Sequence, residues 1–402
     1  MAKRRPSGDG MVRRRDDGRW EGRIVVGHKK DGSPIFRHIL APTQKELLDK
    51  LHQNIQLYQD VELTEDCRIN LAVWLDRWLE EYVVGTVRES TLCGHKNNVE
   101  LYIKPQLGDK KISAITAEDV QKMYTKLKES GRVREHPKYG HQLSDAMICH
   151  IHCTLHHALD DAVAAHLIPR NPTKGAAVPK PNYKSKQILT KAQLDAFLDT
   201  IRKDPIWYDF FYTELTTGLR RGEICGLQWR DFDPETGTLK ISRTLHEEKG
   251  GGLTTGETKT GKGKRQIVLP HSTAELLRER QNTALSEWIF PNPIKPELPM
   301  TPTSAYKRLK VMLKEAGLPS LKFHDLRHTF ATHALTSGVD AKTLSDILGH
   351  TKASFTLDTY THVTGDMQKQ ASVIVGAFME NIFGKELKPW QSDENTAAAA
   401  SI

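Results

Sequence analysis

Short runs of β-branched and aromatic residues alternate with turn signals in the first forty residues. The runs lie at Met11–Arg15, Trp20–Val26 and Ile35–Leu40, and Asp-Gly pairs at 17–18 and 31–32 separate them. An Asp-Gly pair between two such runs is typical of a hairpin turn. After Thr43 the apolar positions take a helical spacing, at Leu47, Leu48, Leu51 and Ile55. The pattern predicts a three-stranded sheet followed by a helix.

A helical pattern then covers about residues 71–167. Near its start, apolar side chains recur at helix spacing, at Trp74, Leu75, Trp78 and Leu79. The sequence Thr-Ala-Glu-Asp at 116–119 is typical of a helix N-terminus, because the hydroxyl and the acid can cap each other's backbone N–H groups. We expect a compact helical domain, with Trp74 and Trp78 in its core rather than on a base-stacking surface.

A basic stretch without acidic residues follows. Residues 172–190 carry three prolines and four lysines, namely Pro172, Pro179, Pro181, Lys174, Lys180, Lys184 and Lys186. Proline and like charges both favour extended chain. The stretch is expected to link two domains, either as a plain spacer or as a strap that lets them close around a duplex.

The remainder begins with another helix start at Thr190 and Gln193 and contains one strand-rich stretch, Leu239–Leu269. A last helix is expected over Met367–Phe383, with Ile374, Phe378 and Ile382 on one side. The tail from 392 to 402 is polar and rich in alanine, which is typical of disorder.

These patterns predict a multidomain α+β chain. Its expected parts are a small three-stranded sheet plus helix at 1–62, a helical domain at 63–171, a linker at 172–189, a mainly helical domain with a small β-sheet or hairpin at 190–388, and a disordered tail at 389–402.

Charge adds a candidate partner. The chain has 58 Lys and Arg against 50 Asp and Glu, a net charge of +8, and residues 1–40 alone hold 11 basic and 5 acidic side chains. A locally basic segment favours a polyanion such as DNA, although the same side chains could simply be solvated. The expected DNA contacts are Arg13, Arg14, Arg15, Arg19, Arg23, Lys180, Lys184 and Lys186.

Other classes of protein are disfavoured. The longest apolar stretch, near residues 372–379, is far short of the roughly 18 to 20 residues that span a bilayer. No apolar segment follows the basic first fifteen residues, so they do not resemble a secretory signal. Five scattered cysteines do not suggest a disulfide framework. The chain is therefore expected in the cytoplasm.

Two short segments carry an arginine with a potential partner three residues away. Arg220 is followed by Glu223 and Arg327 is preceded by His324, a spacing that brings side chains together on one face of a helix. A guanidinium suits a phosphate because its planar fork matches two oxygens and its charge does not titrate. Each segment alone is also compatible with an ordinary surface helix.

Three further segments accompany them in a fixed order. The glycine-rich basic turn Thr258–Arg265, which contains Lys259, lies between the two arginine segments. Leu348-Gly349-His350 comes after them, and Tyr360 follows ten residues beyond His350. The ordered set resembles the catalytic signature of the tyrosine recombinase (phage integrase) family over about residues 188–366.

The rest of the chain agrees with that resemblance. The helical domain is similar to the family's core-binding domain, and the N-terminal sheet plus helix resembles the arm-binding domain of conjugative-transposon and temperate-phage integrases. The resemblance implies a site-specific recombinase that integrates and excises a mobile element. Its implied partners are double-stranded DNA at core and arm sites, three further protomers in a tetramer that exchanges C-terminal helices, and an excisionase or DNA-bending protein.

The resemblance also assigns roles at the phosphate. Arg220 and Arg327 would hold the non-bridging oxygens of the scissile phosphate and neutralise charge in the transition state. Lys259 would protonate the departing 5′ oxygen, with Lys262 and Lys264 as rivals close in sequence. No metal, ATP or other cofactor is implied.

The nucleophile would be Tyr360, which forms a 3′-phosphotyrosyl link that conserves the energy of the phosphodiester. His324 and His350 would add hydrogen bonds to the phosphate, and one of them would accept the tyrosine proton. Glu223 would orient the site or have a purely structural role.

Several alternatives stay open at this point. The run Cys149–His157 offers thiol and imidazole groups that could bind zinc, although histidines facing DNA or packed in the core are favoured. Cys225 is expected to be a small core residue. A type IB-like topoisomerase or a catalytically silent DNA-binding regulator would be alternative functions. The terminal helix could dock on a neighbouring protomer or on its own domain.

Overall fold

The computed structural model describes residues 11–59, 61–182, 187–248, 252–257 and 264–350, with 372, 373 and 375. Contacts divide the chain into two units, residues 1–184 and residues 185–402. Within the described ranges, no helix has the length and apolar character needed to cross a membrane.

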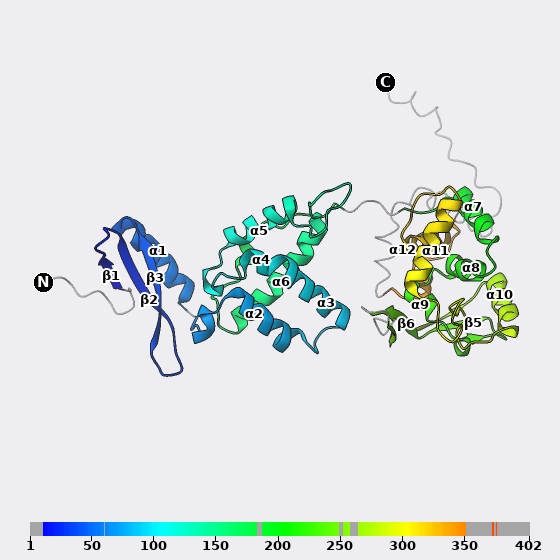
Figure 1. Ribbon diagram of the computed structural model, residues 1–402, viewed down its shortest axis with the longest axis horizontal. Coiled ribbons are helices and arrows are strands. Elements are labelled where there is room, and N and C mark those ends of the chain that lie inside the picture. The colour runs from blue at the N-terminus through cyan, green and yellow to red at the C-terminus, as the bar shows by residue number, and fades with distance from the viewer. Residues whose placement is uncertain are drawn as a thin grey trace, which may run out of the picture. The chain divides into compact units, whose positions relative to one another are not determined.

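The N-terminal part is an antiparallel sheet covered by one helix, as the sequence predicts (Figure 1). Its elements are β1 (Met11–Arg14), β2 (Trp20–His28), β3 (Pro34–Ala41) and α1 (Gln44–Tyr58). Both turn glycines, Gly18 and Gly32, have positive φ angles of 81° and 79°, which explains the Asp-Gly signals. The side chain of Thr43 caps α1, and Leu47 and Leu51 are buried beneath it.

The rest of the first unit is helical. Its elements are η1 (Glu65–Arg68), α2 (Leu71–Arg77), η2 (Trp78–Val83), α3 (Glu89–Asn98), η3 (Val99–Ile103), α4 (Lys104–Leu107), η4 (Ile112–Ala114), α5 (Ala117–Ser130), α6 (Asp145–Ala164) and η5 (Pro172–Gly175). Trp74 and Trp78 are core residues, and their indole N–H groups donate to Ala158 O and to Asp161 Oδ2 on α6. Thr116 and Asp119 form the capping box that the sequence indicates.

The start of the basic stretch packs on this helical core. Thr173 is buried, η5 contacts α5 and α6, and Ala176 and Val178 pack against the core. This part of the expected linker therefore lies on the helical domain. Lys180 is exposed, whereas Lys184 and Lys186 fall outside the described residues.

The second unit is mainly helical with two small sheets. Its elements are α7 (Lys191–Ile201), α8 (Tyr208–Thr217), α9 (Arg221–Cys225), η6 (Trp229–Asp231), β4 (Phe232–Asp233), β5 (Thr238–Ile241), β6 (Arg243–Glu247), β7 (Leu253–Glu257), β8 (Arg265–Val268), α10 (His271–Asn282), α11 (Pro302–Glu315), α12 (Phe323–Thr336) and α13 (Ala341–Leu348). Strands β4, β5 and β8 form one antiparallel sheet and β6 and β7 a hairpin.

Most of these elements share one hydrophobic core, and a smaller apolar cluster lies between α12 and α13. Phe197, Phe210 and Phe211 are fully buried in the larger core, and Cys225 is buried there too, as expected. Thr190 and Gln193 cap α7 as predicted. The expected terminal helix lies outside the described residues except at 372, 373 and 375, which are helical, and the tail lies outside them.

Candidate active site

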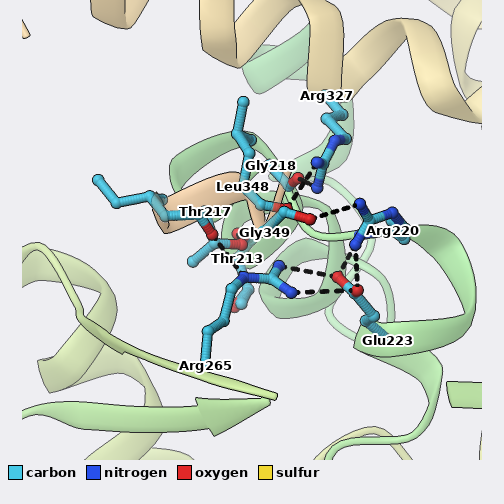
Figure 2. A network of polar contacts seen from close by, with 10 residues as sticks. Thr213, Thr217, Gly218, Arg220, Glu223, Arg265, Arg327, Leu348 and Gly349 are labelled. Carbon is cyan, nitrogen blue, oxygen red and sulfur yellow. Dashed lines mark hydrogen bonds and ion pairs between the residues drawn. The ribbon is translucent and has the colours of Figure 1, made fainter. Parts of the chain in front are cut away.

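Arg327 is a fully buried cation in the second unit. It lies on α12 with 1% of its surface exposed. Its Nη1 donates to Gly218 O at 2.9 Å and its Nη2 to Leu348 O at 2.6 Å (Figure 2). The guanidinium is thus held between the C-terminal ends of α8 and α13, where unpaired carbonyls carry partial negative charge.

Arg220 reaches the same end of α13. Its Nη2 donates to Gly349 O at 3.0 Å, one carbonyl beyond the acceptor of Arg327. Its Nη1 donates to Glu223 Oε1 at 2.7 Å, and 38% of the side chain is exposed. The two arginines therefore converge on consecutive carbonyls, as Figure 2 shows.

The expectation that Arg220 and Glu223 share a helix face is wrong in one respect. Arg220 precedes α9 in an extended conformation, with φ −72° and ψ 145°. Its backbone N–H donates to Glu223 Oε2 at 3.0 Å, so Glu223 caps the helix that follows. His324 and Arg327, by contrast, both lie on α12 as predicted.

Left-handed glycines shape both helix ends that hold the arginines. Gly218 has φ 59° and Gly349 has φ 66°, and each ends its helix. A Cβ at Gly218 would lie 2.4 Å from Phe330 Cδ1, far inside van der Waals contact. Glycine at 218 is required both by the backbone and by the close approach of α12.

Arg265 belongs to this cluster, although its place in the sequence did not mark it as a site residue. It begins β8, and its Nη1 and Nη2 donate to Glu223 Oε1 at 3.1 Å and to Glu223 Oε2 at 2.8 Å. Its Nε donates to Ile347 O on α13. Only its position at the end of a basic turn, directly before a strand, could have indicated it.

The charges in the cluster are coupled. Burial opposes ionisation of Glu223, but hydrogen bonds and charge from Arg265, with Arg220, outweigh it and lower the pKa of Glu223 to about 2. Burial, with the charge of Arg220, lowers the pKa of Arg327 to about 9. At pH 7 the three arginines and the ionised Glu223 therefore sum to +2.

Glu214 is a second acid that the sequence analysis did not single out. It lies on α8 with 0% exposure, and neither carboxylate oxygen has a hydrogen-bond partner in the described structure. Burial raises the pKa of Glu214 well above its ordinary value, which favours the neutral acid. An acid in the apolar run Phe210–Leu215 was the available signal.

His350 directly follows the carbonyl that Arg220 binds. It is 9% exposed, and its backbone N–H donates to Ser345 O at 2.9 Å. Burial, followed by the charges of Arg327 and Arg220, lowers the pKa of His350 to about 4. His350 is therefore neutral at pH 7 and able to accept a proton. His324 is exposed, and its ring meets that of His328 edge-on with centroids 4.6 Å apart.

The other two predicted catalytic residues, Lys259 and Tyr360, lie outside the described residues, as does the rival Lys262. Lys264 is described and exposed. The described residues contain no group of three or more His, Cys, Asp or Glu side chains arranged to hold a metal ion.

Two histidines of Cys149–His157 have polar partners within the helical domain. His152 Nδ1 lies 2.6 Å from Tyr124 Oη, and His156 Nδ1 lies 2.7 Å from Thr173 Oγ1. Both rings are therefore tied to neighbouring side chains of the same domain.

The arginines that were predicted to contact DNA from the sheet do not all lie on the same face of it, because side chains along a strand alternate between the two faces. Arg13 pairs with Glu21 and Arg23 with His38 on the face away from α1, whereas Arg14 alternates to the other face. Arg15 lies just beyond β1, and Arg19 is in the turn, where its Nη2 donates to Asp17 at 2.7 Å.

Comparisons with known proteins cover most of the chain. The model of the phage integrase family matches residues 187–366, and that of the phage integrase N-terminal SAM-like domain matches residues 70–128. A tyrosine recombinase XerC-like protein of Caldanaerobacter subterraneus subsp. tengcongensis is 27% identical over 367 residues, which are 85% of this chain and 91% of the relative. The transposase from transposon Tn916 of Enterococcus faecalis is 26% identical over 301 residues, which cover 70% of this chain and 71% of the transposase.

Solved structures show the same fold. The Tn1549 transposon integrase in complex with a circular intermediate DNA has a TM-score of 0.64 at 23% identity, covering 76% of this chain and 99% of that one. A lambda integrase dimer bound to a COC′ core site has a TM-score of 0.56 at 18% identity, and the match covers 89% of this chain and 96% of the lambda integrase chain. With both domain models matched in order and the arginine cluster assembled within the larger one, the chain belongs to the tyrosine recombinase (phage integrase) family.

Proposed function

We propose that this protein is a site-specific DNA recombinase that integrates and excises a mobile genetic element. The observation that carries the proposal is the convergence of Arg220 and Arg327 on consecutive carbonyls, inside a cluster with net positive charge. Such preorganised donors match the charge that develops on a phosphate under attack. The family membership and the similarity to transposon proteins support the biological role.

In the proposed reaction Tyr360 attacks the scissile phosphorus and forms a phosphotyrosyl bond, and the bond to the 5′ oxygen breaks. Arg220 and Arg327 stabilise the non-bridging oxygens. Lys259 gives the departing oxygen its proton, so the product strand carries a 5′ hydroxyl. Reversal of these steps on a second strand completes the exchange without ATP.

His350 is the better candidate to take the tyrosine proton. A phenol with an ordinary pKa near 10 needs an acceptor as it attacks. His350 remains neutral at pH 7 because burial and the arginines depress its pKa, so one of its ring nitrogens is unprotonated. His324 would then serve as a hydrogen-bond donor to the phosphate.

The proposed substrate is duplex DNA in the cytoplasm, read at core and arm sites. Arg13, Arg15, Arg23 and Lys180 are exposed, which supports their proposed contact with DNA. Arg14, Arg19, Lys184 and Lys186 remain further candidates. The likeness to a lambda integrase tetramer bound to a Holliday junction supports action as a tetramer.

Exchange of the C-terminal helix between protomers is part of the same proposal. A chain truncated near Gly365 is expected to bind DNA but to lose assembly and recombination. An excisionase or DNA-bending partner would set the direction of the reaction.

A recombination assay separates this function from its alternatives. Two plasmids that carry the ends of the element and its target are incubated with the protein in EDTA and without ATP. Recombinant junctions are expected from the wild type and a large loss, on the order of 100- to 1000-fold, from Arg327→Lys. Relaxation of supercoils without junctions would indicate a topoisomerase, and binding without either product would indicate a silent regulator.

A further inference from the structure

The N-terminal sheet has one open face that α1 does not cover. We define the open face as the residues that strand register places together opposite α1, namely Met11, Arg13, Glu21, Arg23, Val25, Phe36, His38 and Leu40. On the covered face, a Cβ at Gly22 would lie only 3.1 Å from Leu51 and 3.4 Å from Leu47 of α1. Six of its eight side chains are exposed in the described part of the chain, so the open face can contact another molecule.

Glu21 is the acidic residue at the centre of this face. Its side chain is only 9% exposed, whereas those of Arg13 and His38 beside it are 59% and 54% exposed. Glu21 Oε2 accepts from Arg13 Nε at 2.8 Å and lies 3.6 Å from Arg15 Nη1, while Oε1 lies 2.9 Å from His38 Nδ1. The carboxylate is thus covered by the basic side chains that it binds.

These contacts fix the direction of the basic side chains. A free arginine samples many rotamers, and holding it in one orientation before binding removes that entropy cost from the complex. Glu21 holds Arg13 through a charge-assisted bond, and the guanidinium of Arg23 lies over the ring of Phe36 at 4.6 Å. Two guanidinium groups are therefore pre-oriented on the open face.

An acid at this position is unfavourable if the face only attracts phosphates. A carboxylate cancels one positive charge and repels the backbone of any DNA, whatever its sequence. Hydrogen bonds from His38 and Arg13 lower the pKa of Glu21, so the negative charge persists at neutral pH. Glu21 must therefore contribute something other than attraction.

We propose that Glu21 is a positioning residue that gives the open face its sequence specificity, by aiming Arg13 and His38 at base edges. The proposal rests on the proposed function, in that the N-terminal domain binds DNA. Arginine reads guanine through two parallel hydrogen bonds, which require a defined guanidinium orientation. Glu21 thus trades some general affinity for discrimination between sequences.

The proposal predicts opposite effects on two kinds of binding. Glu21→Gln removes one negative charge, so affinity for duplex of unrelated sequence rises. The same change releases Arg13 and His38, so affinity for the preferred sequence falls. The ratio of specific to non-specific affinity is expected to drop by about 5- to 100-fold, the discrimination of one bidentate contact.

The test uses the full-length chain and a random pool of DNA duplexes. Bound duplexes are sequenced, and the wild type is expected to select two unrelated motifs, one for the N-terminal sheet and one for the other domains. Glu46→Gln is the matched control, because Glu46 is exposed on α1, away from the open face, and loses the same charge. Arg13→Lys, which keeps the charge but loses the planar fork, is the second variant.

With Glu21→Gln, the base preference at a few positions of one selected motif is expected to weaken. The other motif and the thermal unfolding temperature of the protein are expected to stay unchanged. Arg13→Lys should weaken the same motif without raising non-specific affinity. Equal selection by Glu21→Gln and Glu46→Gln, or a parallel rise of specific and non-specific affinity, would overturn the proposal. Selection of a single motif by the wild type would instead show that the N-terminal domain does not read DNA, and the inference would fail with that part of the proposed function.

Discussion

Arg265 at the start of β8 and Glu223 in α9 are joined through both guanidinium Nη atoms and both carboxylate oxygens. The pair is buried, with side-chain exposures of 6% and 1%. Because Arg265 also donates to Ile347 O and Glu223 also accepts from Arg220, the pair connects β8, α9 and α13. Arg265, the last residue of the basic turn, therefore ties β8 both to the segment that holds Arg220 and to the end of α13 whose carbonyls Arg220 and Arg327 bind.

Replacing Arg265 should cost much stability. Arg265→Gln leaves the Glu223 carboxylate buried with Arg220 alone, and breaking a buried ion pair typically costs about 3 to 5 kcal/mol. Arg202→Gln is the control, since Arg202 and Asp199 form an exposed pair that contributes about 1 kcal/mol or less. Chemical denaturation of both variants measures the difference. Equal unfolding midpoints would contradict the structural role of the Arg265 pair.

The close approach at Gly218 predicts an unequal response to alanine at two left-handed glycines. Gly218 has φ 59° with Phe330 in the way, whereas Gly317 has φ 66° and open space around its Cβ position. Gly317→Ala should cost only the backbone strain, about 1 to 2 kcal/mol. Gly218→Ala should cost clearly more and also reduce DNA cleavage, because the Gly218 carbonyl holds Arg327. Thermal unfolding and cleavage rates of the two variants test this, and similar losses in both would refute the steric argument.

The buried acid Glu214 makes stability depend on pH. Since burial raises the pKa of Glu214 above its unfolded value of 4.5, the native state binds the extra proton and loses stability as pH rises above about 4.5. Glu214→Gln removes this loss. The variant should gain stability relative to the wild type between pH 5 and pH 8, as followed by unfolding in denaturant. A constant difference across that range would mean that Glu214 is ionised in the native protein.

His350 should titrate far below an ordinary histidine. Its pKa of about 4, against an ordinary 6.5, means that the unfolded chain binds a proton there between pH 6.5 and 4 and the native chain does not. His350 therefore contributes a loss of stability as pH falls through that window. NMR of protein labelled at the histidine rings, with His350→Gln for assignment, reads the value directly. A midpoint near 6.5 in the free protein would remove the argument for a neutral proton acceptor.

Local signals in the sequence predicted the elements well because their causes are local. The Asp-Gly turns, the Thr43 cap of α1 and the capping boxes at Thr116 and Thr190 depend on residues within four positions of one another. The helix that carries His324 and Arg327 follows from the same kind of spacing. Periodicity also gave the core positions of Trp74 and Trp78.

The site itself depends on contacts that spacing does not encode. Arg265 meets Glu223 across 42 residues and Ile347 across 82. The extended backbone at Arg220 arises because α8 ends at the left-handed Gly218 and a new helix starts at Arg221. The burial of Glu214, within range of the charge of Arg327, likewise depends on the packing of α8 against α12, which spacing does not encode.

In the proposed mechanism, strand exchange proceeds through a covalent bond between Tyr360 and DNA. The measurement uses a duplex nicked next to the crossover position. Cleavage then releases a short strand that diffuses away, and because rejoining needs the 5′ hydroxyl of that strand, the covalent adduct accumulates. Wild type and Tyr360→Phe are compared on a denaturing gel, in EDTA and without ATP, after equal DNA binding has been verified. We predict an adduct with the wild type and none with the phenylalanine variant. An adduct that survives the substitution would contradict the assignment of the nucleophile, and a wild type that binds but forms none would contradict the mechanism.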